Sequence, residues 1–370
     1  MSDRPRLGGQ ILGRLLVRLG ILAATLVLAL PGCASAQPPP GATVHRIVAV
    51  GDLHGDFAAW RAIARAAGLT DARGRWTGGA TVFVQTGDVV DRGPDGLKII
   101  KDLMRLQREA PRADGRVVTL VGNHEAMNMT GDLRYVSAAD FAAYADANSE
   151  RVRQQTYAAN KAQLEAIYRQ KDPTMTSEAI KAAWLAATPP GALEHQAAWR
   201  PDGSIGRWIV SNPAVALVDG NLFVHGGISP AYAHVPLDEI NRQVAAALTA
   251  QATAPEAIIN DPAGPLWYRG LAVREDASPP ADDTAAATPA APTVAEQLDV
   301  LLPAFGARRI VIGHTPRLSG IAIEEGGRLA RIDTGISSAY GGTLSYLEIL
   351  DGNLSPHAVA RPEPAQKGTK

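Results

Sequence analysis

The chain has 370 residues, of which 46% are hydrophobic and 20% are charged, as in an ordinary soluble globular protein. The formal net charge is −1 and the basic residues are scattered, so composition gives no support to a nucleic-acid-binding role. Cys33 is the only cysteine, which excludes an intrachain disulfide.

The first 36 residues are predicted to be a secretory signal peptide. Four arginines precede the apolar run 19–30, and the small residues 34–36 follow it. This run is shorter than the roughly 20 residues of a membrane span, and a retained anchor is the alternative interpretation. Cleavage after residue 36 predicts a periplasmic or secreted protein. The "LPGC" segment loosely resembles a lipoprotein site, so membrane anchoring through a lipidated Cys33 is a second alternative to the favoured soluble export.

Residues 37–44 are predicted to form a proline-rich tether, and the folded domain is predicted to span 45–360 with a tail at 361–370. Short apolar runs alternate with helical stretches in its first part. The predicted strands are 46–50, 81–85 and 116–121, and the predicted helices between them are 57–68 and 96–109. This alternation indicates βαβ units and a mostly parallel sheet.

An Ala-rich helical insertion is predicted over about 137–187. Residues 206–227 are predicted to return to strands, with a hairpin turn at "DGN" (219–221), and residues 235–250 are predicted to be helical. The low-complexity segment 275–293 is predicted to be a mobile surface loop.

The last part of the chain is again rich in predicted strands. Residues 308–315 are predicted to be a strand that ends in a polar turn. The following segment is predicted to form a hairpin that bends at Gly326-Gly327.

Five of the predicted strands end in glycine-bearing turns that contain side chains able to bind a metal ion: Asp52 and His54, then Asp88, then Asn123 and His124, then His225, then His314. Sites in open α/β sheets form beyond the carboxyl ends of strands, where these loops converge. Carboxylate, amide and imidazole ligands suit Mn²⁺, Fe or Zn²⁺. Two divalent ions that share a carboxylate would activate a water and clamp a phosphoryl group.

Each of these turns also has a structural interpretation. A Gly-Asp pair often only forms a turn, Asn123 could cap the next helix, and a strand-end histidine such as His314 is often a satisfied polar residue. Four of the eight histidines fall in the turns, however, and this recurrence favours the metal site.

The motifs "GDLHG" (51–55), "GDVVDRG" (87–93), "GNHE" (122–125), "HGG" (225–227) and "GHTP" (313–316) resemble, in order, those of the calcineurin-like metallophosphoesterases. The "DRG" and "HGGISP" forms are similar to the phosphoprotein phosphatase branch. "DGSIGRWIVSNP", "GPLWYRG" and "IDTGISSAYGG" resemble the bacterial Shewanella-like phosphatases. Pro316 stands where many metallophosphoesterases have a second histidine, which also favours the phosphoprotein phosphatase pattern. The resemblance implies an α/β fold, a β-sandwich flanked by helices with a helical insertion.

The resemblance also implies two divalent metal ions bridged by Asp88, with the remaining ligands Asp52 and His54 for the first ion and Asn123, His225 and His314 for the second. His124 would protonate the leaving-group oxygen, and Asp91 would orient its imidazole. Arg92 would bind the phosphate through its planar guanidinium.

Two further substrate-binding residues follow from weaker similarity. Arg269 in "WYRG" would be a second phosphate clamp, although a surface or packing arginine is an equal alternative. Tyr340 would correspond to a tyrosine that overlooks the metals in relatives.

The predicted function is a dinuclear-metal-dependent phosphomonoesterase that hydrolyses phosphoprotein or phosphopeptide, on serine/threonine or tyrosine, by attack of a metal-bridging water. The first alternative is a metallophosphatase acting on nucleotides or other small phosphate esters. A non-catalytic metal-binding module is a lesser alternative, disfavoured because no motif lacks its acid or ligand.

Overall fold

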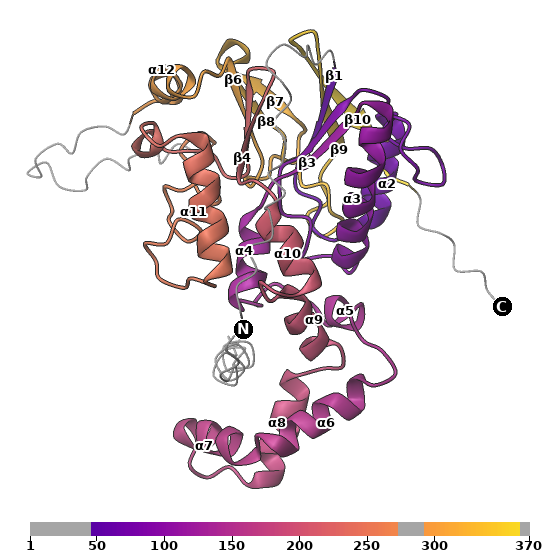
Figure 1. Cartoon of the computed structure of the whole chain (residues 1–370), viewed down its shortest axis with the longest axis vertical. Helices are drawn as coiled ribbons and strands as arrows, with labels where there is room; N and C mark the ends of the chain where they lie inside the picture. Colours follow the sequence, from indigo (N-terminus) through magenta and orange to yellow (C-terminus); the bar gives the residue numbers. More distant parts are fainter. Residues whose placement is uncertain (1–45, 273–291, 363–370) are drawn as a thin grey trace, which may run out of the picture.

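Within residues 46–272 and 292–362, which the computed structural model describes, ten strands form two five-stranded sheets that pack face to face (Figure 1). The predicted signal peptide and tether lie outside the described residues. So does the predicted loop 275–293, apart from its last two residues. The α/β sandwich predicted from the motifs is confirmed.

The first sheet has the strand order β10-β9-β1-β2-β3. Its strands are β1 (Arg46–Val50), β2 (Val82–Gln85), β3 (Arg116–Thr119), β9 (Leu344–Leu350) and β10 (Asn353–Val359). β1, β2 and β3 are parallel, whereas β9 and β10 run antiparallel to their neighbours. The carboxyl ends of the three N-terminal strands therefore lie at one edge.

The second sheet has the order β4-β5-β6-β8-β7. Its strands are β4 (Val215–Val218), β5 (Asn221–Val224), β6 (Arg309–Ile312), β7 (Ala322–Glu324) and β8 (Leu329–Arg331). β5, β6 and β8 are parallel, and β4 and β7 are antiparallel edge strands. The hairpins predicted at 219–221 and at Gly326-Gly327 are both present, as β4–β5 and β7–β8.

The inner strands β1, β2, β5 and β6 have buried side chains on both faces, because the other sheet covers one face and the outer face is covered as well. In β1, Ile47 and Ala49 pack between the sheets, and the alternating Val48 and Val50 face the helices. The same alternation places Phe223 of β5 in the layer between the sheets. This two-sided burial explains why the strands appear in the sequence as continuous apolar runs.

Helices cover the outer faces. Helix α2 (Phe57–Ala66) contacts β9 and β10, α3 (Gly96–Glu109) contacts β3, and α11 (Leu237–Thr249) contacts β4. Trp60 of α2 stacks on Phe83 at a ring distance of 5.1 Å. Trp60 also donates to the buried Asp102 of α3 at 2.9 Å, so its indole N–H is satisfied. Helix α12 (Val294–Ala304) precedes β6.

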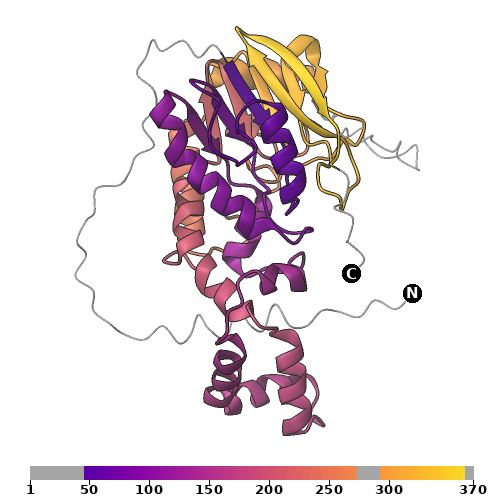
Figure 2. The ribbon, with the colours of Figure 1, turned by 90° about the vertical axis from the view of Figure 1, so that its right-hand side faces the viewer.

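A helical segment follows α4 (Asn123–Thr130) and leads to β4. Its helices are α5 (Ala138–Ala142), α6 (Ser149–Ala159), α7 (Lys161–Lys171), α8 (Ser177–Ala187), α9 (Ala192–Trp199) and α10 (Ser204–Ser211). Helices α6, α7 and α8 stand apart from the sheets in both views (Figures 1 and 2). They enclose a small core of Tyr157, Leu164 and Trp184.

Two details differ from the sequence-based expectations. The prediction of strands from residue 206 is wrong for residues 206–211, which belong to α10. There, Ile205, Trp208 and Ile209 recur at helical spacing and are all buried. In addition, Arg361, placed in the tail, is tied to the domain by hydrogen bonds to Asp56 and to the Ile336 carbonyl. None of the helices in the described part of the chain combines the length and apolar character needed to cross a membrane.

Candidate active site

The predicted metal-binding residues converge where strands of both sheets end. The loops that follow β1, β2 and β3 belong to the first sheet, and those that follow β5 and β6 belong to the second. All seven turn residues singled out above are at most 6% exposed: Asp52, His54, Asp88, Asn123, His124, His225 and His314. Residues up to 262 positions apart thus meet in one buried cluster.

The loops after β1 and β2 are joined through the backbone of Asp88. Its carbonyl accepts hydrogen bonds from the N–H groups of Leu53 and His54, both at 3.0 Å, and the carbonyl of Val89 accepts one from Gly55. These bonds fix the two loops against each other, so the side chains of His54 and Asp88 are placed by main-chain contacts.

Backbone conformations of positive φ are concentrated in this cluster. Ten non-glycine residues in the described part of the chain have positive φ, and five of them are predicted site residues: His54, Asp88, Asp91, Arg92 and His314. Such conformations cost on the order of 1–3 kcal/mol each and persist where the surrounding structure enforces them. The fold therefore holds these side chains in strained positions, as functional sites commonly do.

The carboxylate of Asp88 lies at the centre of the cluster. Its Oδ2 is 3.4 Å from His225 Nε2, 3.7 Å from His54 Nε2 and 3.9 Å from His124 Nε2. Two groups of potential metal ligands result, one of His54, Asp88 and His124 and one of Asp88, His225 and His314. Both groups contain Asp88, so this carboxylate is placed to be shared.

The donor atoms fit a bound cation. His225 Nδ1 must carry a proton, because it lies 2.9 Å from the carbonyl of Thr86, which can only accept. When His225 is neutral, its Nε2 directs a lone pair toward Asn123 Oδ1 at 2.9 Å and toward Asp88. Burial lowers the pKa of His225, but the charge of Asp88 outweighs burial and raises the pKa above its ordinary value. Three acceptors that face one another repel unless positive charge lies among them. The buried Nε2 of His314 also has no hydrogen-bond partner among the described residues, as expected of a ligand atom.

Burial keeps two of the histidines neutral. It lowers the pKa of His54 to about 4, although the charge of Asp88 acts in the opposite direction. It lowers the pKa of His314 to about 2, and the neighbouring His225 adds to this effect. Neutral imidazole is the form that binds metal ions. The proton on His54 Nδ1 is donated to the carbonyl of Val90 at 3.0 Å, so its Nε2 is the available ligand.

Asp52 connects the loop that follows β1 with the loop that follows β6. Its oxygens accept the His314 N–H at 3.1 and 3.2 Å, and its Oδ2 is 3.9 Å from His54 Nε2. Burial raises the pKa of Asp52, and the charges of Asp333 and Asp88 raise it further. A nearby cation would relieve this concentration of negative charge. Asp333, itself buried, is an acid that the motif-based prediction did not include.

His124 differs from the other histidines because its Nδ1 bonds to a carboxylate. Nδ1 lies 2.6 Å from Asp91 Oδ2, and Asn128 donates to both oxygens of Asp91 at 3.1 and 3.2 Å. Burial lowers the pKa of His124, but Asp88 and the Asp91 hydrogen bond outweigh it and the pKa lies above its ordinary value. Asn128 was missed from the sequence, although its position four residues after His124 on α4 places it on the same helix face.

Glu125, the last residue of "GNHE", joins the loops after β2 and β3. Its Oε2 accepts the N–H groups of Asp88 and Gly122, both at 2.8 Å, and its Oε1 accepts that of Val89 at 2.9 Å. Gly122 has to be glycine here, because a Cβ would lie 2.2 Å from Asp88 Oδ1. Glu125 thus positions Asp88 without belonging to either ligand group.

The predicted substrate-binding residues surround this cluster. The guanidinium of Arg92 lies over the ring of Tyr135 at 4.0 Å and is 5.7 Å from the ring centre of Tyr340. The Tyr340 ring is 5.3 Å from that of His54. Arg269 donates to Thr315 Oγ1 at 3.0 Å and lies 3.4 Å from the carbonyl of His314. Tyr135, on a loop without a recognisable motif, was not predicted.

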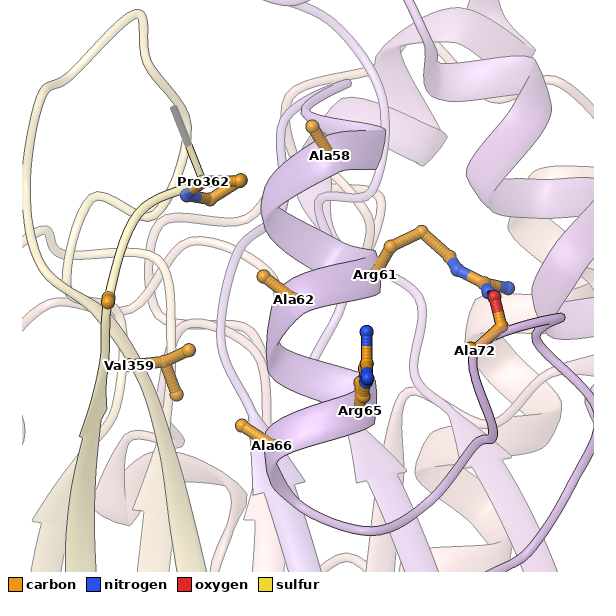
Figure 3. A pocket seen from close by; sticks show the side chains of 9 residues that line it. Ala58, Arg61, Ala62, Arg65, Ala66, Ala72, Val359 and Pro362 are labelled. Carbon is orange, nitrogen blue, oxygen red and sulfur yellow. Dashed lines mark hydrogen bonds between the residues drawn. The ribbon is translucent and has the colours of Figure 1, made fainter. Parts of the chain in front are cut away.

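A cavity outside the strand-end cluster is lined by none of these site residues. It has a volume of about 630 Å³ and lies between α2 and the end of β10, with Arg61 and Arg65 on one side and Val359 and Pro362 on the other (Figure 3). The other residues that line it are all alanines. It offers neither metal ligands nor an acid, so the chemistry is assigned to the strand-end cluster.

Comparison with known proteins identifies the family to which this chain belongs. The calcineurin-like phosphoesterase family matches residues 45–318, and the chain belongs to this family. The chain is 33% identical over 312 residues to an uncharacterised protein of Schizosaccharomyces pombe, covering 82% of this chain and 76% of that protein. It is 40% identical over 203 residues to Shewanella-like protein phosphatase 2 of Arabidopsis thaliana, covering 54% of this chain and 50% of that protein.

A solved structure supports the fold. The cold-active protein tyrosine phosphatase of a psychrophilic Shewanella species has a TM-score of 0.59 and 22% identity, covering 86% of this chain and 81% of that one. A point mutant of cold-active protein tyrosine phosphatase has a TM-score of 0.61 with the same coverage and identity. The family assignment makes the chain a metallophosphatase, a hydrolase of phosphoric esters, and its relatives include protein phosphatases.

Proposed function

We propose that this protein is a phosphomonoesterase that binds two divalent cations and hydrolyses phosphorylated protein or peptide. The proposal rests on one observation above all: two groups of buried potential ligands share Asp88, and His124 of the first group is paired with Asp91. This arrangement supplies cation ligands and a proton carrier in one place. The protein phosphatases among the relatives support the choice of substrate.

One cation would be held by Asp52, His54 and Asp88, and the other by Asp88, Asn123, His225 and His314. The ligand set suits Mn²⁺, Fe or Zn²⁺. When bound, the cations would supply Lewis acidity, which lowers the pKa of water and neutralises phosphate charge. We place Asp52 rather than His124 with His54, because the Nδ1 of His124 is paired with a carboxylate and not with a carbonyl. The charges of Asp88 and Asp91 outweigh burial and raise the pKa of His124, as suits a proton donor.

His124 would deliver a proton to the leaving-group oxygen. Asp91 accepts the Nδ1 proton, so the transferable proton of the imidazolium is the one on Nε2, the nitrogen that faces Asp88 at 3.9 Å. Asn128 keeps the Asp91 carboxylate in place, so the imidazole orientation is set before substrate arrives. A positioned acid of this kind contributes roughly 10²–10⁴-fold to a rate.

Arg92 would bind the phosphate oxygens, since its side chain has no carboxylate partner among the described residues and its donors are available. Arg269 is tethered next to His314 through Thr315 and would bind phosphate from that side. Tyr340 lies close to both His54 and Arg92 and would border the bound phosphate group.

A decisive test combines metal analysis with a substrate panel. The purified protein would be analysed for Mn, Fe and Zn and then assayed on phosphotyrosine, phosphoserine and phosphothreonine peptides and on nucleotides. We expect about two metal ions per chain and the highest kcat/KM on a phosphopeptide. A clear preference for nucleotides or other small esters would overturn the proposed substrate class while leaving the metal site intact.

We further propose that the protein is exported to the periplasm or secreted after removal of residues 1–36. The support is the charge and hydropathy pattern of that segment. N-terminal sequencing of the protein from the producing cell would test this. A lipid-modified N-terminus at Cys33 would instead indicate membrane anchoring.

A further inference from the structure

The guanidinium of Arg92 is held by aromatic rings and by no acid. Within residues 46–272 and 292–362, its side chain forms no ion pair or hydrogen bond, while Tyr135 lies 4.0 Å below it and Tyr340 lies 5.7 Å away. The side chain of Arg92 is exposed to solvent. Its backbone has a left-handed φ of 68°. The contacts of this long side chain are therefore with the two rings and not with a charged partner.

We propose that Tyr135 is a positioning residue for Arg92, and that its ring holds the guanidinium ready to bind phosphate. A ring face attracts a cation without occupying its N–H groups. A carboxylate in the same place would use those groups and offset the positive charge. Tyr135 thus restrains Arg92 and leaves its donors free for a phosphate dianion.

The surroundings of Tyr135 give it a defined position. Its carbonyl accepts the backbone N–H of Arg92 at 3.4 Å, so the two residues are linked through the main chain as well as the side chains. The next residue, Val136, is buried, and Ser137 caps α5 by accepting the N–H of Asp140. Tyr135 therefore lies on the short connection between α4, which contains His124, and the first helix of the insertion.

The ring also approaches the catalytic acid proposed above, at 4.9 Å from the ring of His124. A substitution of Tyr135 could therefore act through His124 instead of Arg92. A test has to separate these two routes, and inorganic phosphate provides the means, because it binds Arg92 without requiring a proton from His124.

This inference rests on the proposed phosphate-binding role of Arg92. The experiment measures binding of inorganic phosphate to the Mn²⁺-loaded protein by calorimetry, for the wild type, Tyr135→Leu, Tyr135→Phe and Arg92→Ala. We expect Tyr135→Leu to weaken phosphate binding roughly 2- to 30-fold, the range of a cation–π contact. Tyr135→Phe keeps the ring and should retain most of the affinity.

The double variant Arg92→Ala/Tyr135→Leu then shows whether Tyr135 acts on phosphate binding through Arg92 or by another route. If Tyr135 acts by positioning Arg92, the Leu substitution weakens phosphate binding little once Arg92 is gone. An undiminished effect in that background, or equal loss in Tyr135→Phe and Tyr135→Leu, would overturn the inference. Tyr168→Leu, on helix α7 away from the sheets, is the matched control and should bind phosphate like the wild type.

The outcome is independent of the substrate assignment. A wild-type protein that binds phosphate but fails on every phosphopeptide contradicts the proposed substrate and leaves the Tyr135 test valid. If Arg92→Ala binds phosphate as well as the wild type, the role of Arg92 fails and the positioning role of Tyr135 fails with it.

Discussion

The imidazole Nδ1 of His124 lies 2.6 Å from Asp91 Oδ2, while the main-chain N–H of the same histidine donates to Asp88 Oδ1 at 2.9 Å. One residue therefore contacts both the central carboxylate of the metal-binding cluster and a separate orienting acid. Because ring and backbone are both held, the position of Nε2 is determined before any substrate binds.

Replacing His124 by asparagine should remove the proton donor and preserve the shape of the loop. We expect His124→Asn to lower kcat by roughly 10²–10⁴-fold with metal content near that of the wild type. The measurements are turnover of an aryl phosphate and elemental analysis of the purified variant. His357→Asn on β10 is the control for loss of a histidine. Wild-type turnover in His124→Asn would remove this residue from the mechanism.

Asp88→Asn should empty the metal site, because both ligand groups depend on the same carboxylate. The amide lacks the negative charge that balances a shared cation, so we expect metal content and activity to fall together. Elemental analysis after gel filtration measures the metal content. Asp299→Asn on the surface helix α12 is a control and should keep its metal. Retention of two ions by Asp88→Asn would show that the carboxylate is not shared.

Glu125→Gln tests the junction between the loops. The carboxylate accepts three backbone N–H groups, whereas an amide presents its own N–H to at least one of them. We expect the free energy of unfolding to fall by about 1–3 kcal/mol, the cost of an unsatisfied buried donor. Chemical denaturation measures it. Glu296 occupies the same N3 position of helix α12 but is exposed, so Glu296→Gln should cost less. Equal losses in both variants would argue against a special role of Glu125.

The pH dependence of stability should reveal the buried His195. This residue packs among Phe141, Tyr144 and Trp199 at the base of the insertion, and burial lowers its pKa to about 3. Below the ordinary pKa of about 6.5, the unfolded chain gains a proton that the folded chain excludes. The folded state is therefore fully favoured above pH 6.5 and loses stability as the pH falls toward 3.

At pH 4.5 this effect amounts to about 3 kcal/mol, from the difference between 6.5 and 4.5. His195→Phe keeps an aromatic ring in the cluster and cannot be protonated. We expect its stability to fall less between pH 7 and pH 4.5 than that of the wild type, as measured by denaturant unfolding at both values. Parallel losses in the two proteins would show that His195 is protonated in the folded state or that its surroundings open.

The sequence predicted the strand-end turns well because local patterns define them. Apolar runs followed by Gly-Asp or Gly-Asn indicated both the strands and the polar residues that the structure brings together. The same reasoning failed for residues 206–211, where β-branched residues suggested a strand and tertiary packing of Ile205, Trp208 and Ile209 favours a helix. Tyr135 and Asp333 were missed because their proximity to the site depends on contacts between distant segments, which no local pattern encodes.

The cluster around Asp88 has a consequence for the whole molecule, because His225 and His314 follow strands of one sheet while Asp88 follows a strand of the other. A cation bound by these three residues would cross-link the two halves of the sandwich, and its binding free energy would add to the stability of their association. Chelation should therefore lower the unfolding temperature of the protein as well as its activity. Conversely, a substitution that separates the layers, such as Phe223→Ala, should weaken metal affinity from a position outside the cluster.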